Sequence, residues 1–191
     1  CHAEKWGIMK SQYIVYPEKE KVDLWEEEIA PPEEGEILCQ AEKSLISIGT
    51  ELHALRGVAD PGTNWYDWLK FPFRPGYSMV GRVIGVGKGV THIKEGDRVA
   101  SYGYHQQYYK IKLFDVTRRH DIPEGVEGYV LPDGISSEDG TWRSLAVTTQ
   151  NALRRGSFQF GESAVVVGLG ILGQLVTQYL IELGHRQFAE I

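Results

Sequence analysis

Ala164-Val-Val-Val-Gly-Leu-Gly-Ile-Leu-Gly173 is the part of this 191-residue sequence that says most about its fold. Its first four residues are apolar, as is typical of a strand that lies buried inside a parallel sheet. The next six residues, Gly168 to Gly173, match the pattern Gly-x-Gly-x-x-Gly. An amphipathic helix that ends at Gly184 is predicted to follow, and its apolar face comprises Ile171, Leu175, Tyr179 and Leu183.

The position of these glycines between a strand and a helix favours a phosphate-binding turn. In such a turn the first glycine permits the tight bend, the second lets the backbone approach a pyrophosphate, and the third lets the helix pack on the strand. Amides at the helix N-terminus then face the phosphates. The pattern predicts the first β-α unit of a Rossmann domain, and its candidate cofactor-binding residues are Gly168, Gly170, Ile171, Leu172 and Gly173. In the alternative interpretation the glycines only shape the turn and hold no ligand.

The acid that contacts the cofactor ribose is expected about 20 residues after the glycines, at the end of the second strand. That strand is predicted at Arg186 to Glu190, where Glu190 is the only acid and lies slightly early for this contact. The sequence ends at Ile191, so the further strands that would surround a dinucleotide are missing from it. We therefore expect that this chain alone does not bind NAD or NADP tightly.

Residues before the glycine-rich stretch have a mainly β pattern. Short runs of β-branched and aromatic residues alternate with glycine and proline turns from Met9 to about residue 113, which predicts a small barrel or sandwich. A strand at residues 22–28 is expected to pair with one at 11–16. Thr50 is expected to cap a short helix over residues 51–55.

The remaining segments complete a division of the sequence into domains. Residues 59–75 are interpreted as an aromatic loop, and Ser136 is predicted to cap a helix that runs to about Arg155. The predicted division is a leader or tag at 1–8, a β domain at 9–135, and a linking helix with an incomplete Rossmann domain at 136–191.

Composition limits the classes of partner and location. The 42% hydrophobic and 24% charged content is that of an ordinary globular protein. A net charge of −6 argues against a nucleic-acid or anionic-membrane partner, and the densest basic runs are only Arg118-Arg119 and Arg154-Arg155. No apolar run approaches the roughly 18 residues of a membrane span. Two cysteines, Cys1 and Cys39, cannot form a disulfide framework, so we expect a cytoplasmic protein.

Six segments, taken together and in order, resemble the medium-chain dehydrogenase/reductase superfamily. They are Ile48-Gly-Thr-Glu-Leu-His53, Pro75-Gly-Tyr-Ser78, Val80-Gly-Arg-Val83, Gly96-Asp-Arg-Val99, Leu131-Pro-Asp-Gly134 and the glycine pattern at 168–173. The resemblance implies a GroES-like β domain followed by a Rossmann domain. It also implies an enzyme that transfers a hydride between NAD(P) and an alcohol or carbonyl.

The sequence departs from the zinc-dependent members of this superfamily at the metal ligands. Those members have Cys-Gly-Thr-Asp-x-His and Pro-Gly-His-Glu at the first two segments, whereas this sequence has Ile48 for the cysteine, Tyr77 for the histidine and Ser78 for the glutamate. The third ligand position falls near Arg143, and no cysteine follows Cys39 to build a structural zinc lobe. Catalytic zinc needs three ligands of the Cys, His, Asp or Glu type. We therefore predict a site without zinc, as in the bacteriochlorophyllide dehydrogenase-like and bi-domain oxidoreductase branches.

The resemblance also implies candidate catalytic residues. Thr50 and His53 correspond to the hydroxyl and imidazole that relay the alcohol proton, and their spacing places both on one side of a helix. Tyr77 is predicted to donate a hydrogen bond to a carbonyl oxygen. The alternatives are that Thr50 is only a helix cap, that His53 is a surface histidine, and that Tyr77 fills the former metal cavity. His92, His105 and His120 have no metal-ligand spacing and are assigned no role.

Three functional hypotheses follow. The first is a zinc-independent oxidoreductase represented by a truncated chain, and the second is a catalytically inert fragment that folds and self-associates. The third, a co-chaperonin, is disfavoured because the start of a Rossmann domain has no place in one. Unpaired strand edges promote association between chains, so we also expect a homo-oligomer formed through residues 163–183.

Overall fold

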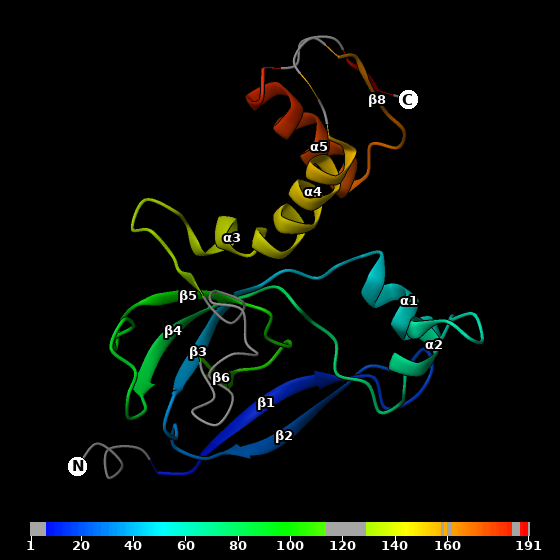
Figure 1. The fold of residues 1–191 in the computed structure, drawn as a ribbon. Coiled ribbons are helices and arrows are strands. Elements are labelled where there is room, and N and C mark those ends of the chain that lie inside the picture. Colours follow the sequence, from blue (N-terminus) through cyan, green and yellow to red (C-terminus); the bar gives the residue numbers. More distant parts are fainter. Residues whose placement is uncertain (1–6, 114–128, 158, 160–161, 185–187, 191) are drawn as a thin grey trace. The chain divides into compact units, whose positions relative to one another are not determined.

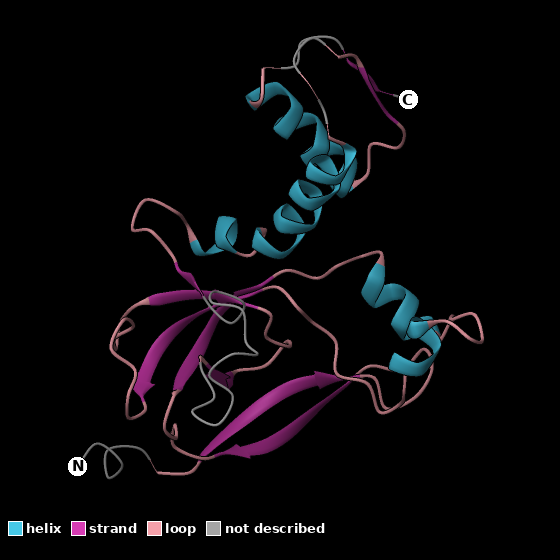
Figure 2. Ribbon diagram, viewed as in Figure 1, coloured by secondary structure: helices cyan, strands magenta, loops and turns pink. Residues whose placement is uncertain are grey.

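The computed structural model describes residues 7–113, 129–157, 159, 162–184 and 188–190 (Figures 1 and 2). The chain forms two compact units, Cys1–Thr141 and Trp142–Ile191. Arg118-Arg119 and His120, like residues 1–6 of the predicted leader, lie outside the described residues.

Strands dominate the first unit, as the sequence predicted (Figure 2). Two of them form a hairpin, and the other five form an antiparallel sheet in the order β6-β3-β4-β5-β7. The strands are β1 (Met9–Val15), β2 (Asp23–Ile29), β3 (Glu36–Ser44), β4 (Met79–Val86), β5 (Arg98–Ser101), β6 (Tyr108–Lys112) and β7 (Tyr129–Val130). The predicted pairing of the first two strands is confirmed, because β1 and β2 are antiparallel with Val15 opposite Asp23.

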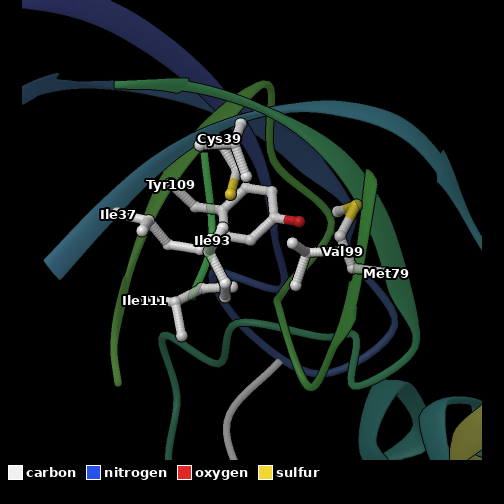
Figure 3. Close-up of a cluster of buried hydrophobic side chains, with 8 residues drawn as sticks. Ile37, Cys39, Met79, Ile93, Val99, Tyr109 and Ile111 are labelled. Atoms are coloured by element: carbon white, nitrogen blue, oxygen red, sulfur yellow. The ribbon is translucent and has the colours of Figure 1, made fainter. Parts of the chain in front are cut away.

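The five-stranded sheet carries a closed apolar core (Figure 3). Its buried members are Ile37, Cys39, Met79, Val83, Ile93, Val99, Tyr109 and Ile111. Ile37, Cys39 and Val99 are 0% exposed. Complete burial of one such aliphatic side chain contributes about 1.5–3 kcal/mol. Burial also raises the pKa of the Cys39 thiol to about 12, because desolvation disfavours the thiolate.

Among the described residues of the first unit are three short helices: α1 (Thr50–Arg56), α2 (Asn64–Trp68) and α3 (Ser137–Gly140). The prediction that Thr50 caps α1 is wrong, since Thr50 is the first helical residue and Gly49 occupies the cap position without a side-chain bond. Gly57 does end the helix in a left-handed conformation. The segment predicted as an aromatic loop, residues 59–75, also contains a helix, α2. Thr63 caps this helix, since the Tyr66 amide donates to the Thr63 hydroxyl at 3.3 Å.

The single helix predicted from Ser136 to Arg155 is two helices, α3 and α4 (Arg143–Gly156). Ser136 caps the first of them, accepting a hydrogen bond from the amide of Asp139. The Thr141 hydroxyl donates to the carbonyl of Glu138 at 2.6 Å, a local bond that competes with continued helix. The sequence pattern therefore located the helical region but not its interruption.

The second unit comprises α4, β8 (Ala164–Val166), α5 (Ile171–Glu182) and β9 (Phe188–Glu190). Strands β8 and β9 are parallel, with Ala164 opposite Phe188, so the strand-helix-strand order is that of the start of a parallel α/β domain. Its buried cluster is small and consists of Leu153, Ala164, Val166 and Leu180.

Two details of the second unit differ from the predictions. Strand β8 is covered on one face only, because Val165 is 62% exposed. The buried face of α5 is centred on Leu180, at 1% exposed, whereas the predicted Leu183 is 55% exposed. A repeat of four residues drifts about 40° per step around a helix of 3.6 residues per turn, so the predicted stripe could not stay on one face.

Candidate functional site

A pocket in the first unit brings together two of the predicted catalytic residues. Its volume is about 470 Å³, and it is lined by Gly49, Thr50, His53, Val58, Ala59, Asp60, Thr63 and Trp65. Thr50 and His53 reach it from the first turn of α1, while Trp65 comes from α2. The lining is therefore mixed: Val58, Ala59 and Trp65 are apolar, while two threonines, a histidine and an aspartate supply polar groups, as in many small-molecule sites.

The helix start holds the His53 side chain. Nδ1 of His53 lies 3.2 Å from the carbonyl oxygen of Gly49, one turn earlier. His53 is exposed and Thr50 is half-buried. The imidazole is therefore in contact with solvent, while Thr50 is partly covered at the same pocket.

Tyr77 is not among the residues that line this pocket. It is half-buried, and its hydroxyl donates to Oγ of Ser47 at 2.6 Å. Ser47 is three residues before Thr50, so this bond ties Tyr77 to the chain that leads into α1. The structure thus places Thr50 and His53 together and Tyr77 beside the same helix start.

The corresponding zinc-ligand positions do not fit the metal. Ile48 is apolar and 66% exposed, Tyr77 offers only a phenol, and Ser78 is 2% exposed with no hydrogen-bond partner for Oγ among the described residues. Across the part of the chain that the structure describes, no three His, Cys, Asp or Glu side chains are grouped closely enough to hold a metal ion. Zinc is normally held by three or four such ligands.

Two residues that the sequence did not single out form a buried pair next to this region. Nε2 of His105 lies 2.8 Å from Oε2 of Glu51, and the side chains are 5% and 4% exposed. Glu51 was expected only as a helix residue, and His105 was assigned no role. The Ser47 amide donates to Oε1 of Glu51 across the helix start, but nothing in the sequence indicated His105.

A second pocket, of about 490 Å³, runs along β6 and contains none of the predicted site residues. Arg74 lies in its wall and makes a bidentate ion pair with Glu27, at 2.9 and 2.7 Å. Because the charge of Arg74 is already paired, its role is structural: it joins the segment before β4 to the hairpin.

The glycine-rich turn has the backbone geometry that a dinucleotide site requires. Gly168 has a φ of +89°, Gly170 is the N-cap of α5, and a Cβ at Gly170 would meet no atom within 4 Å. A Cβ at Gly173 would lie 1.9 Å from the carbonyl oxygen of Gly168, so only glycine lets the helix approach the turn. Ile171 and Leu172 are the first two residues of α5. These residues fit a pyrophosphate held by helix-terminal amides.

No helix in the described parts of the chain combines the length and apolar character needed to cross a membrane.

Comparison with known proteins places these features in a family. The model of the alcohol dehydrogenase GroES-like domain matches residues 35–154. An alcohol dehydrogenase of Moraxella sp. (strain TAE123) is 26% identical over 193 residues, covering 86% of this chain and 53% of that protein. One from Geobacillus stearothermophilus is 30% identical over 191 residues, covering 90% of this chain and 54% of its own length.

A solved structure has the same fold. Alcohol dehydrogenase rspB of Escherichia coli CFT073, complexed with NADH, superposes with a TM-score of 0.75 at 16% identity, over 95% of this chain and 56% of that one. This chain spans about half the length of the relatives that it matches. The mainly β fold with helices after it is thereby confirmed as GroES-like, and the chain belongs to the alcohol dehydrogenase GroES-like domain family of the medium-chain dehydrogenase/reductase superfamily.

Proposed function

We propose that residues 9–135 are the catalytic domain, and residues 136–191 the start of the nucleotide-binding domain, of a zinc-independent oxidoreductase. The enzyme interconverts an alcohol and a carbonyl with NAD or NADP. The observation that carries this proposal is the pocket at the start of α1, which presents Thr50 and His53 although the positions of the metal ligands are occupied by Ile48 and Tyr77.

Each of the three candidate catalytic residues has a distinct task in this proposal. The Tyr77 hydroxyl now donates to Ser47, and a carbonyl oxygen that replaces Ser47 as the acceptor would receive the same hydrogen bond. Thr50 and the exposed His53 carry the proton between the pocket and solvent. Val58 and Trp65 enclose the apolar part of the substrate. The nicotinamide, when bound, supplies or accepts the hydride.

The cofactor is proposed to lie on the glycine-rich turn, held by the backbone of Gly168, Gly170, Ile171, Leu172 and Gly173. The open space at Gly170 and the glycine-dependent packing at Gly173 support this placement. Because a dinucleotide contacts several strands of a complete domain, we propose that this chain alone binds NAD or NADP weakly.

Association between copies of the chain is also proposed. Val165 in β8 and Val167 in the loop after it are 62% and 81% exposed, which leaves apolar surface for contact through residues 163–183. The proposed location is the cytoplasm, with no nucleic acid and no membrane among the partners.

The second candidate function is a catalytically inert fragment that folds and self-associates. The exposure of Val165 and Val167 favours it, because apolar surface left uncovered at β8 and at the start of the glycine-rich turn promotes association between copies.

One set of experiments separates the two. NADH and NADPH are titrated while cofactor fluorescence is recorded, and reduction of a panel of aldehydes and ketones is then measured with and without a zinc chelator. The proposal predicts weak but saturable binding, very slow turnover that the chelator does not change, and no stoichiometric zinc by elemental analysis. Tyr77→Phe is expected to lower kcat about a hundredfold, whereas Tyr102→Phe in the other pocket leaves it unchanged. Absence of binding at millimolar cofactor would establish the inert fragment.

A further inference from the structure

The buried pair of Glu51 and His105 joins three separate segments of the first unit. Nε2 of His105 contacts Oε2 of Glu51 at 2.8 Å, and Nδ1 contacts Oγ of Ser44 at 2.9 Å. Oε1 of Glu51 accepts a hydrogen bond from the Ser47 amide at 2.9 Å. The pair therefore links the end of β3, the start of α1 and the segment before β6.

The same pair holds Tyr77 from two sides. Through its side chain, Glu51 fixes Ser47, whose Oγ accepts the hydrogen bond from Tyr77. Through its backbone, His105 donates to the carbonyl of Pro75 at 3.1 Å. Gly76 has a φ of +106°, and a Cβ there would lie 2.6 Å from the His105 amide nitrogen, so these two segments are in direct contact. Tyr77 follows immediately in the chain.

Stability alone does not account for a buried ionisable pair of this kind. Replacing such a pair by apolar residues of similar volume is often neutral or stabilising, because both groups lose their hydration. The remaining polar atoms here are satisfied by specific partners, Ser44 for the imidazole and the Ser47 amide for the carboxylate. A network in which each member has a partner fixes one arrangement of its surroundings.

We propose that Glu51 and His105 are positioning residues for the catalytic site, a role that rests on the proposed function. The pair holds the first turn of α1, with Thr50 and His53, in a fixed relation to Ser47 and the Tyr77 hydroxyl. By hydrogen bonds it thereby keeps groups from separate segments at fixed positions relative to one another, as a metal ion does by coordination.

The test compares Glu51→Gln with Glu36→Gln. Glu36 forms an ion pair with Lys110 at 2.7 Å at the opposite end of β3 from Ser44, so its variant removes a part-buried ion pair without touching this network. In the full chain with ¹³C-labelled tyrosine, the Tyr77 resonance is assigned by its absence in Tyr77→Phe. We expect Glu51→Gln and His105→Gln to shift or broaden that resonance and Glu36→Gln to leave it unchanged.

Kinetics supply the second readout. At saturating cofactor, Glu51→Gln and His105→Gln are each expected to lower kcat about tenfold. The substrate KM is expected to stay within about twofold of the parent value, because only the orientation of the catalytic groups is lost. The double variant is expected to equal the single ones, because the two residues act as a unit. Glu36→Gln keeps the parent kcat.

Folding is monitored by near-ultraviolet circular dichroism, and Ser44→Ala provides a milder variant that removes only the partner of Nδ1. It is expected to shift the Tyr77 resonance in the same direction and to lower kcat about threefold. A folded Glu51→Gln chain with an unmoved Tyr77 resonance and parent kcat would overturn the proposal. If the parent chain has no dehydrogenase activity, the proposed function fails, while the tyrosine resonance still tests whether the pair positions Tyr77.

Discussion

The two units of this chain differ in how completely they bury their own apolar residues. The first unit surrounds Ile37, Cys39 and Val99 until none of their surface is exposed. The second unit has the same kind of residues, yet Val167 is 81% exposed in the loop immediately after β8. The two units therefore contain similar apolar residues. The number of strands and helices packed around those residues decides whether they form a closed core.

The closed core is tested most strongly through Cys39. Burial raises its thiol pKa from an ordinary value of 9.0 to about 12, so the thiolate fraction at pH 8 is about a thousandfold lower than for an exposed thiol. We expect alkylation of Cys39 by iodoacetamide to be at least that much slower in the folded chain than in urea, as measured by peptide mass spectrometry. A Cys39 that reacts at the unfolded rate would show that the core opens freely.

The direction of the pH dependence follows from the same shift. The unfolded chain loses the thiol proton above pH 9, whereas the folded chain keeps it up to about pH 12. The contribution of this group to stability therefore falls as the pH rises through that window.

Gly87→Ala is the substitution expected to destabilise the first unit most. A Cβ there would lie 1.7 Å from the carbonyl oxygen of Glu33, and backbone cannot move aside as a flexible side chain can. We expect the free energy of unfolding to fall by about 3 kcal/mol, measured by urea titration. Gly134→Ala is the matched control, because its Cβ meets no atom within 4 Å. Equal losses in both variants would mean that lost glycine flexibility, not the clash, sets the cost.

In the second unit the corresponding change is Gly173→Ala. Its Cβ would lie 1.9 Å from the carbonyl oxygen of Gly168, so α5 must move away from the turn. We expect a loss of about 2 kcal/mol that is confined to this unit, seen as faster amide exchange in α5 and unchanged exchange in β3 and β4. The control is Gly170→Ala, which has open space around it. Faster exchange in both units would show that they unfold together.

The same comparison explains what the sequence could predict. Motifs with fixed spacing predicted the β-rich unit, the turn at Gly168 to Gly173 and the parallel pairing that follows it, because local chain geometry determines those features. Thr50 and His53 share a pocket because they are three residues apart on one helix. Glu51 and His105 are 54 residues apart, so only the tertiary fold brings them together. A contact of that kind leaves no local pattern in the sequence.

The smallest effect on stability is expected for Val167→Lys. This variant tests the exposed apolar surface of the second unit. A side chain that is 81% exposed has little packing to lose, so the free energy of unfolding should change by less than about 0.5 kcal/mol. If copies of the chain associate through residues 163–183, the new charge should nevertheless shift the sedimentation coefficient toward that of a monomer, because a charge is costly in an apolar contact. A large loss of stability in the monomer would instead mean that Val167 packs within its own chain. An unchanged oligomer would place the contact elsewhere. Unfolding and sedimentation together thus show whether the Val167 side chain is buried by its own chain or by a second copy.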